Sequence, residues 1–414
     1  MTPPISRALQ ALLAVTLLGS PLAAQAAGEP LRRPAGPEMG YDDGFFLRSS
    51  DGAHELKVEG LFQVLGRYNG RRRTPDSEFE LKRMRPEFAG RIADHYRFKL
   101  EPKFDEDGVE LEEAWAGMEM AGDAGLLMFG RMKAPFGLEE VRSRRHIPFS
   151  FFSILNQFSP AEQHGVFLNG MRDKLEYGFA AYNGGGGDEH DRGKEVAARA
   201  MWHPFKGDFG TTLEALQFGA AMTYGRESRS LAGESIRTAS HLPLMDYESS
   251  TRLDGDQWRL GLEGAWYDGP YMAQAEVLYM RQELEGAGAR GDVDHWGAYL
   301  GAWTTLTGED VSFSGISPRN AFRSGHPGEE GALVLASRIS YLHSDRALRD
   351  NGWLVPNGYT EGITSLWLGL NWYLSEHAML RNGYVHSFYS DSVGVDGSAA
   401  RSEGAFLIEF QLHF

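Results

Sequence analysis

The stretch "HYRFKLEPKFD", His95 to Asp105, decides the fold class because apolar and charged residues alternate along it. The apolar set is Tyr96, Phe98, Leu100, Pro102 and Phe104, and the set between them is His95, Arg97, Lys99, Glu101, Lys103 and Asp105. A helix of 3.6-residue period would mix the two sets, so the alternation predicts a β-strand with one apolar and one charged face. Pro102 removes one ladder hydrogen bond from this strand.

The same alternation recurs along the rest of the chain. We expect sixteen strands, which start near residues 54, 79, 94, 109, 125, 164, 174, 194, 213, 256, 270, 293, 332, 362, 378 and 402. Many would run for about eleven to fifteen residues, whereas strands of soluble proteins run for about five or six and a tilted membrane strand needs ~9–11. The pattern favours an all-β, sixteen-stranded antiparallel transmembrane β-barrel over a soluble β-sandwich or an extracellular β-solenoid.

The connections between these strands tend to alternate in length. Short connections follow the second, sixth, tenth and fourteenth strands, and long ones follow the fifth (133–163), the ninth (227–255) and the thirteenth (345–361). Short periplasmic turns and long external loops are typical of outer-membrane barrels. Two connections break the rule: 105–108 is short where a long one is due, and 308–331 is long where a short one is due.

Composition and the N-terminus indicate an exported chain. The 414 residues include 51 glycines and no cysteine, which excludes disulfides and thiol catalysis, and the formal net charge is -16. The mean hydropathy of -0.38 is compatible with a barrel, since barrel strands are apolar on one side only. We interpret residues 1–26 as a signal peptide, 27–53 as an N-terminal periplasmic segment with a loop-like stretch over 28–40, and 54–414 as the barrel.

Charged residues on the inner face predict what the barrel does. In a closed barrel the apolar face contacts lipid, so the charged face lines the lumen, and sixteen strands leave room for an aqueous channel. The expected lumenal cations of the strands are Lys82, which lies just off the parity of its strand, Arg83, Arg85, Arg97, Lys99 and Arg131. Arg131 is assigned inward by taking Met128 and Gly130 as lipid-facing. Parity does not decide whether Glu112 or Glu113 points inward.

The long connection after the fifth strand adds further cations, namely Lys133, Arg142, Arg144 and Arg145. A long loop at this place can fold into the barrel and narrow it, and a ring of Arg and Lys at a constriction favours anions. The alternative is that these cations pair with lumenal glutamates and form a rigid charge lattice. Both arrangements can hold together, and we expect net attraction of anions at the constriction.

Several motifs resemble those of the phosphate-selective porin O/P family. "YDDGFFLRSSDGAHELKVEGLFQV" is similar to the opening of that family, "FGRMKAPFGLEE" to its fifth strand and entry into loop three, and "GLNWY" and "NGYVHS" to its late strands. The resemblance covers nearly the whole mature chain. It implies a trimeric outer-membrane barrel with an inward-folded third loop that guides anions such as phosphate. The family's paired cations correspond to Lys82 and Arg83, a tyrosine two places on is Arg85, and an acid corresponds to Glu112.

Other positions depart from the family pattern. The first-strand arginine falls on Leu61, the loop-three lysine after "GLE" is Glu140, and a later loop-three arginine falls near Phe152. A serine-lysine segment is replaced by "RSRR" at 142–145, and the arginine ladder after the ninth strand is thinned to Arg237. These differences favour an anion-biased porin over a phosphate-specific one.

We therefore predict an outer-membrane porin of a Gram-negative bacterium that passes small anions, with phosphate as the candidate. The partners expected are inorganic anions, outer-membrane lipid and two further copies in a homotrimer, with no nucleic acid. A general porin without phosphate specificity is the alternative, followed by a hydrolase embedded in a barrel. No cofactor and no metal site is expected, and no nucleophile–base motif indicates an enzyme.

Overall fold

The computed structural model describes residues 36–70, 77–106, 108–121, 124–184, 193–356, 358–395 and 397–414. The signal peptide predicted over 1–26 lies outside these residues and stays a prediction. No helix in the described part of the chain is long and apolar enough to span a membrane.

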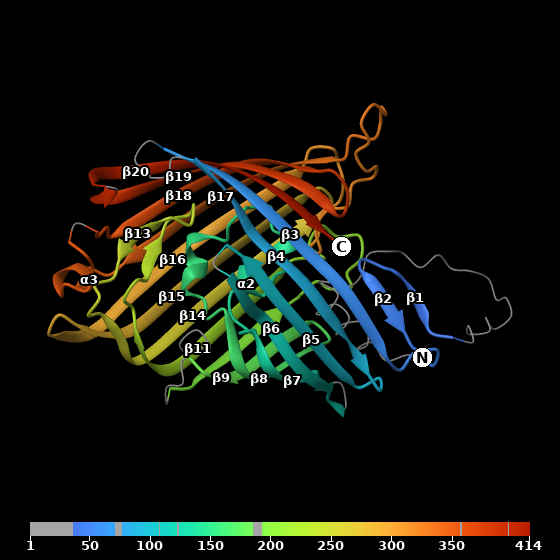
Figure 1. Cartoon of the computed structure of the whole chain (residues 1–414), viewed down its shortest axis with the longest axis horizontal. Coiled ribbons are helices and arrows are strands. Elements are labelled where there is room, and N and C mark those ends of the chain that lie inside the picture. The colour runs from blue at the N-terminus through green and yellow to red at the C-terminus, as the bar shows by residue number, and fades with distance from the viewer. Residues whose placement is uncertain are drawn as a thin grey trace.

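Sixteen long strands form the wall of a closed antiparallel barrel (Figure 1). They are β3 (Glu55–Asn69), β4 (Ser77–Ile92), β5 (Tyr96–Asp105), β6 (Gly108–Glu119), β7 (Leu126–Lys133), β8 (Glu162–Arg172), β9 (Leu175–Tyr182), β10 (Glu195–Trp202), β11 (Gln217–Ser230), β14 (Arg252–Asp268), β15 (Tyr271–Gly286), β16 (Ala289–Thr305), β17 (Ala332–Ser344), β18 (Gly362–Tyr373), β19 (Ala378–Val395) and β20 (Ser398–His413). The predicted fold class and the number of wall strands are confirmed.

Pairing of β20 with β3 closes the barrel, with a register that runs from Ala405 opposite Asn69 to His413 opposite Leu61. Side chains along β20 show why this wall belongs in lipid. Phe406, Ile408, Phe410 and Leu412 face outward and are 37–46% exposed. Leu407, Glu409 and Gln411 between them are fully buried against the interior. The period-two alternation thus places apolar side chains toward lipid and polar ones toward the lumen.

A small hairpin precedes the barrel. It consists of β1 (Glu38–Tyr41) and β2 (Phe45–Arg48), and β2 pairs with the beginning of β3. β2 continues along β3 where β20 ends, because Phe45 lies opposite Val58 while Phe414 bonds to Gly60. The expectation that residues 28–40 are loop-like is therefore wrong for the last three, since β1 gains ladder hydrogen bonds from β2.

The connections divide the barrel into a loop end and a turn end. The loop end carries L3 (134–161), L5 (231–251) and L7 (345–361), and the turn end carries the β1–β2 hairpin, the C-terminus and the long turn T6 (306–331). Short elements in the loops are α2 (Leu138–Val141), η2 (Arg144–His146), η3 (Ile154–Phe158), β12 (Ser235–Arg237), β13 (Pro243–Asp246) and α3 (Ala347–Asp350).

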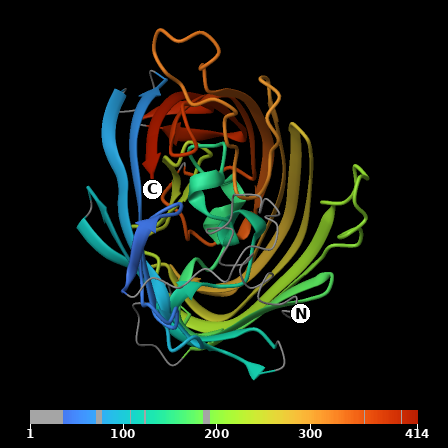
Figure 2. The same ribbon diagram turned by 90° about the vertical axis from the view of Figure 1, so that its right-hand side faces the viewer.

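L3 lies within the ring of strands, as the view along the barrel shows (Figure 2). Its apolar residues pack against one side of the inner wall. Ile154, Leu155 and Phe158 join a buried cluster with residues of L5, L7 and β14–β20. Phe149 packs edge-on against Trp303 and Trp367, with ring centroids 6.1 and 5.9 Å apart. The open space of the lumen therefore lies beside the opposite wall.

Candidate functional site

Two cavities lie in the described part of the lumen, on either side of L3. The upper cavity, at the loop end, has a volume of about 640 Å³ and is bounded by β3–β8, L3 and L5. The lower cavity, at the turn end, has a volume of about 1300 Å³ and extends to T6. Arg144 lines both cavities and thus stands at the boundary between them. A solute that crosses the barrel by this route must pass the Arg144 side chain.

A β-bulge places two consecutive cations of β4 in the lumen. Gln63 of β3 pairs with Arg83 and Val64 pairs with Leu81, so Lys82 is the extra residue. Phe79 on the lipid side of the bulge and Met84 beyond it are both exposed, 82% and 41%. Parity alone would turn Lys82 toward lipid, and the bulge turns it inward beside Arg83.

A second bulge settles the orientation of the acids on β6. Glu101 of β5 pairs with Glu113 and Pro102 pairs with Leu111, which leaves Glu112 as the extra residue. Both acids consequently point inward: Glu112 accepts a hydrogen bond from Arg85 at 2.5 Å, and Glu113 lies 3.4 Å from Lys99. Pro102 is tolerated because it lies at this irregularity, where the regular ladder is already interrupted.

Most of the lumenal cations are held in ion pairs. Arg85 contacts Glu101 at 2.7 Å, Lys99 contacts Glu101 at 2.7 Å, and Lys82 contacts Glu409 at 2.8 Å. The wall therefore carries the charge lattice that was considered as an alternative. Such pairs fix side-chain positions and leave little net charge for a passing ion.

Arg83 is different. Within the described residues its guanidinium makes no hydrogen bond and no ion pair, although Arg83 lines the upper cavity. Its electrostatic neighbours include Arg144, which lies 3.7 Å from Glu140 and over the ring of Phe152 at 4.3 Å. Glu409 and Glu112 also act on Arg83, but from beyond ion-pair distance. A half-buried cation without a direct ion pair is poorly solvated and favours the entry of an anion.

L3 is held in place by polar contacts as well as by its apolar side. Arg145 pairs with Glu59 of β3 at 2.6 Å, and Arg338 of β17 pairs with Glu139 at 2.9 Å. Arg142 donates to Gln274 and to the carbonyl of Ser312 in T6, so the long turn supports L3 from the turn end. These contacts reach opposite sides of the wall and fix the loop across the lumen.

The predicted site residues are distributed between the two cavities. The upper cavity is lined by Lys82, Arg83, Glu112, Arg131 and Arg144, and the lower by Arg85, Lys99, Lys133, Arg142, Arg144 and Arg145. Their part in attracting anions stays a prediction. Lys133 donates to the carbonyls of Glu140 and Arg142, which indicates that it also shapes the start of L3.

Arg97 shares a face of β5 with Lys99, but it lines neither cavity: it is hydrogen-bonded to Glu119 near the turn end of the wall, and its part in attracting anions stays a prediction. One assignment from parity was wrong. Met128 does not face lipid: it is 3% exposed and lines the lower cavity, while Phe129 is 47% exposed. Arg131 still reaches the upper cavity, beside a local irregularity at Gly130, whose φ is 136°.

Sequence reasoning missed several charged residues of the lumen. Arg67 lines the upper cavity together with Glu162, which accepts no hydrogen bond and forms no ion pair within the described residues. Arg237, named above only as the remainder of an arginine ladder, lines it as well. Glu409 binds both Lys82 and Arg381. Parity on the last strand indicates that Glu409 faces inward, but no sequence signal predicts its partners across the wall.

The chain matches the family described as phosphate-selective porin O and P over residues 60–414. The chain belongs to this family. It is 27% identical over 168 residues to Porin O of Pseudomonas aeruginosa, an alignment that covers 37% of this chain and 34% of that protein. The chain thus spans about a third of the length of that curated relative. It is a β-barrel of the outer membrane of a Gram-negative bacterium.

Solved structures of outer-membrane proteins share the fold. OmpT of Vibrio cholerae in a trimer form superposes with a TM-score of 0.55 at 12% identity, over 87% of this chain and 100% of that one. The anion-selective porin from Comamonas acidovorans has a TM-score of 0.52 at 10% identity, over 87% and 100% of the two chains. At these identities the likeness concerns the fold alone.

Proposed function

We propose that this member of the porin O and P family forms a water-filled channel for passive diffusion of small anions, with phosphate as the candidate substrate. The observation that carries the proposal is Arg83, a lumenal guanidinium without hydrogen bond or ion pair within the described residues, beside Arg144 at the boundary of the two cavities. A channel of this kind needs no nucleophile, so the proposal is of a pore rather than an enzyme.

The charge lattice is central to this proposal. Paired cations such as Arg85 and Lys99 contribute little net potential, because acids lie within about 3 Å of them. Selectivity then depends on the few charges that remain unbalanced at the narrowest place. A weak to moderate preference for anions follows, rather than exclusive passage of one anion. The trimer form of OmpT supports the proposal that three copies assemble.

Reversal potentials across planar bilayers in a KCl gradient test the proposal. We expect the sign for anion preference in the unaltered protein and a shift toward zero in Arg83→Gln. Arg226→Gln is the matched control: it removes the same charge from β11, but Arg226 is exposed and lines neither cavity. A preference for cations would contradict the proposed anion preference, and an absence of conductance would contradict the proposal that the barrel forms a channel.

Phosphate is tested separately by adding it to a chloride current. Block of the current at low phosphate concentration, weakened in Arg83→Gln, is expected if Arg83 binds the anion. Unchanged chloride current would assign the protein to anion-biased porins without phosphate preference.

A further inference from the structure

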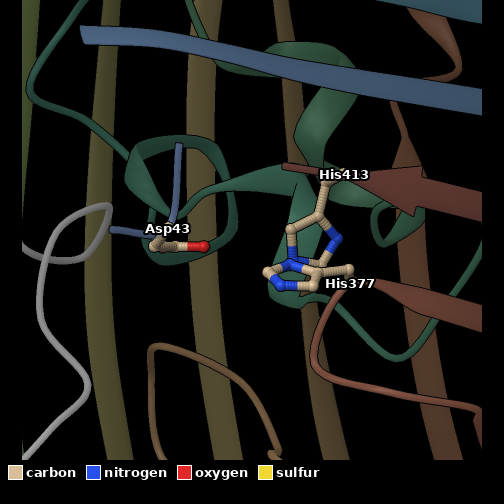
Figure 3. Close-up of side chains that lie close together, drawn as sticks. All are labelled: Asp43, His377 and His413. Atoms are coloured by element: carbon tan, nitrogen blue, oxygen red, sulfur yellow. The ribbon is translucent and has the colours of Figure 1, made fainter. Parts of the chain in front are cut away.

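Three residues with metal-binding side chains meet at the turn end of the barrel (Figure 3). Asp43 lies in the turn between β1 and β2, His377 in the turn between β18 and β19, and His413 at the end of β20. One candidate ligand atom from each residue lies within 4.8 Å of those of the other two. No spacing in the sequence predicts this cluster, because its members come from both ends of the chain.

We propose that Asp43, His377 and His413 bind a divalent first-row transition-metal ion of the zinc type. Two imidazoles and one carboxylate suit zinc, whereas calcium and magnesium prefer sites made of oxygen alone. Three protein ligands leave a fourth position for water or for another side chain. Glu376 is near enough to take that position or to add negative potential, since its Oε1 lies 3.4 Å from Nε2 of His377.

The side chains are positioned for such a site. The carboxylate of Asp43 accepts no hydrogen bond within the described residues and points toward both histidine rings (Figure 3). Gln411 contacts Nδ1 of His413 at 3.3 Å, which leaves the other ring nitrogen for the cluster. The hydroxyl of Tyr41 lies 3.2 Å from Nε2 and 3.4 Å from Nδ1 of His377, so it contacts the edge of that ring and limits its movement.

Burial at the cluster permits exchange of an ion with solvent. His413 is 5% exposed, His377 is half-buried and Asp43 is exposed. Ligands of tetrahedral zinc lie about 3.3 Å apart, given metal–ligand distances near 2.0 Å. The present spacing, at most 4.8 Å, therefore has to close by up to about 1.5 Å, to which rotation of the exposed Asp43 side chain and of the half-buried His377 ring contributes.

A bound ion would join the N-terminal hairpin to the last strand. β2 lies on β3 directly beyond Phe414, and the ring of Phe45 packs edge-on against Phe414 at 5.9 Å. Metal ligation would add a cross-link between Asp43 of the hairpin and His413 of β20. The three ligands lie together only when the hairpin and β20 are folded onto β3. An ion that binds them would therefore stabilise the closed barrel by mass action.

Zinc binding to the purified, chelator-stripped protein tests this site, with Zn²⁺ itself as the probe in calorimetric titration. We expect one Zn²⁺ per protomer, and at least about tenfold weaker binding in Asp43→Asn and His377→Gln, since even changes next to a metal ligand cost that much. Asn tolerates the positive φ of 49° at residue 43, so Asp43→Asn keeps the turn. His95→Gln is the control, because His95 is exposed in another turn at the same end.

Thermal unfolding with and without Zn²⁺ provides a second readout. The unfolding temperature of the unaltered protein and of His95→Gln is expected to rise with Zn²⁺, and that of Asp43→Asn to stay unchanged. No binding at micromolar Zn²⁺, or equal binding by all four proteins, would overturn the proposal.

Discussion

Replacing Glu139 by Gln is expected to loosen L3 inside the barrel. Glu139 accepts a hydrogen bond from Arg338 at 2.9 Å and one from the backbone N–H of Ser153 at 2.6 Å, and both side chains of the ion pair are 1% exposed. A glutamine offers one acceptor oxygen in place of two. This oxygen can accept the hydrogen bond from either Arg338 or Ser153. The side-chain NH2 group of the glutamine then faces the other donor.

The free energy by which Glu139→Gln weakens the attachment of L3 follows from the burial of this ion pair. Removing one partner of a buried ion pair costs about 3–5 kcal/mol. Arg338 keeps the carbonyls of Phe151 and Phe152, at 3.0 and 2.9 Å, so we expect the lower part of this range. A loss of about 3 kcal/mol increases the population of a displaced L3 by about a hundredfold.

Single-channel recording in planar bilayers measures this effect. Glu139→Gln should show a larger mean conductance and more open-channel noise than the unaltered protein. Glu361→Gln is the control, because Glu361 pairs with Arg346 in L7 and these side chains are 33% and 65% exposed. An exposed pair of this kind contributes about 0–1 kcal/mol. If Glu139→Gln recorded the same conductance and noise as Glu361→Gln, the ion pair would not hold L3.

Two further predictions concern acids of the upper cavity. Glu162→Gln should increase the preference for anions in reversal-potential measurements, because it removes a lumenal carboxylate that has no ion-pair partner within the described residues; a shift toward cations would refute this. Burial alone would raise the pKa of Glu140, but Arg144 and Lys133 outweigh it and hold that pKa below its usual range. The contribution of Glu140 to stability is therefore complete above about pH 4.3 and is lost as the pH falls through the lowered pKa. Unfolding temperatures should thus fall less steeply on acidification in Glu140→Gln than in the unaltered protein, and equal slopes would contradict the assignment.

The sequence predicts the wall of this barrel well because a membrane barrel imposes one physical rule at each strand. Lipid on one side and water on the other require strict alternation, and β20 shows it from Phe406 to Phe414. The rule fails where the backbone departs from a regular ladder. Lys82 and Glu112 lie in bulges, so counting by two places Lys82 off parity and leaves Glu112 undecided. Arg131 does reach the lumen as predicted, but the count that put it there took the buried Met128 as lipid-facing.

The site is less predictable than the wall for a different reason. Whether a lumenal cation is available to a solute depends on partners that come from distant strands. Arg85 and Arg83 are two residues apart on the same face, yet Arg85 is bound by Glu101 and Glu112 while Arg83 has no such partner in the described residues. Neither composition nor spacing distinguishes them, because strand register and the place of L3 decide the pairing.

The two bulges suggest how the lining of such a barrel can change over generations. In a regular strand only every second codon encodes a residue that a solute meets, and substitutions are confined to those positions. Insertion of one residue, as at Lys82, adds a neighbouring lumenal charge and leaves the lipid-facing sequence on either side, Phe79 and Met84, in place. Single-codon insertions are therefore a route to new selectivity that leaves membrane insertion intact, and libraries that vary strand length as well as residue identity would sample it.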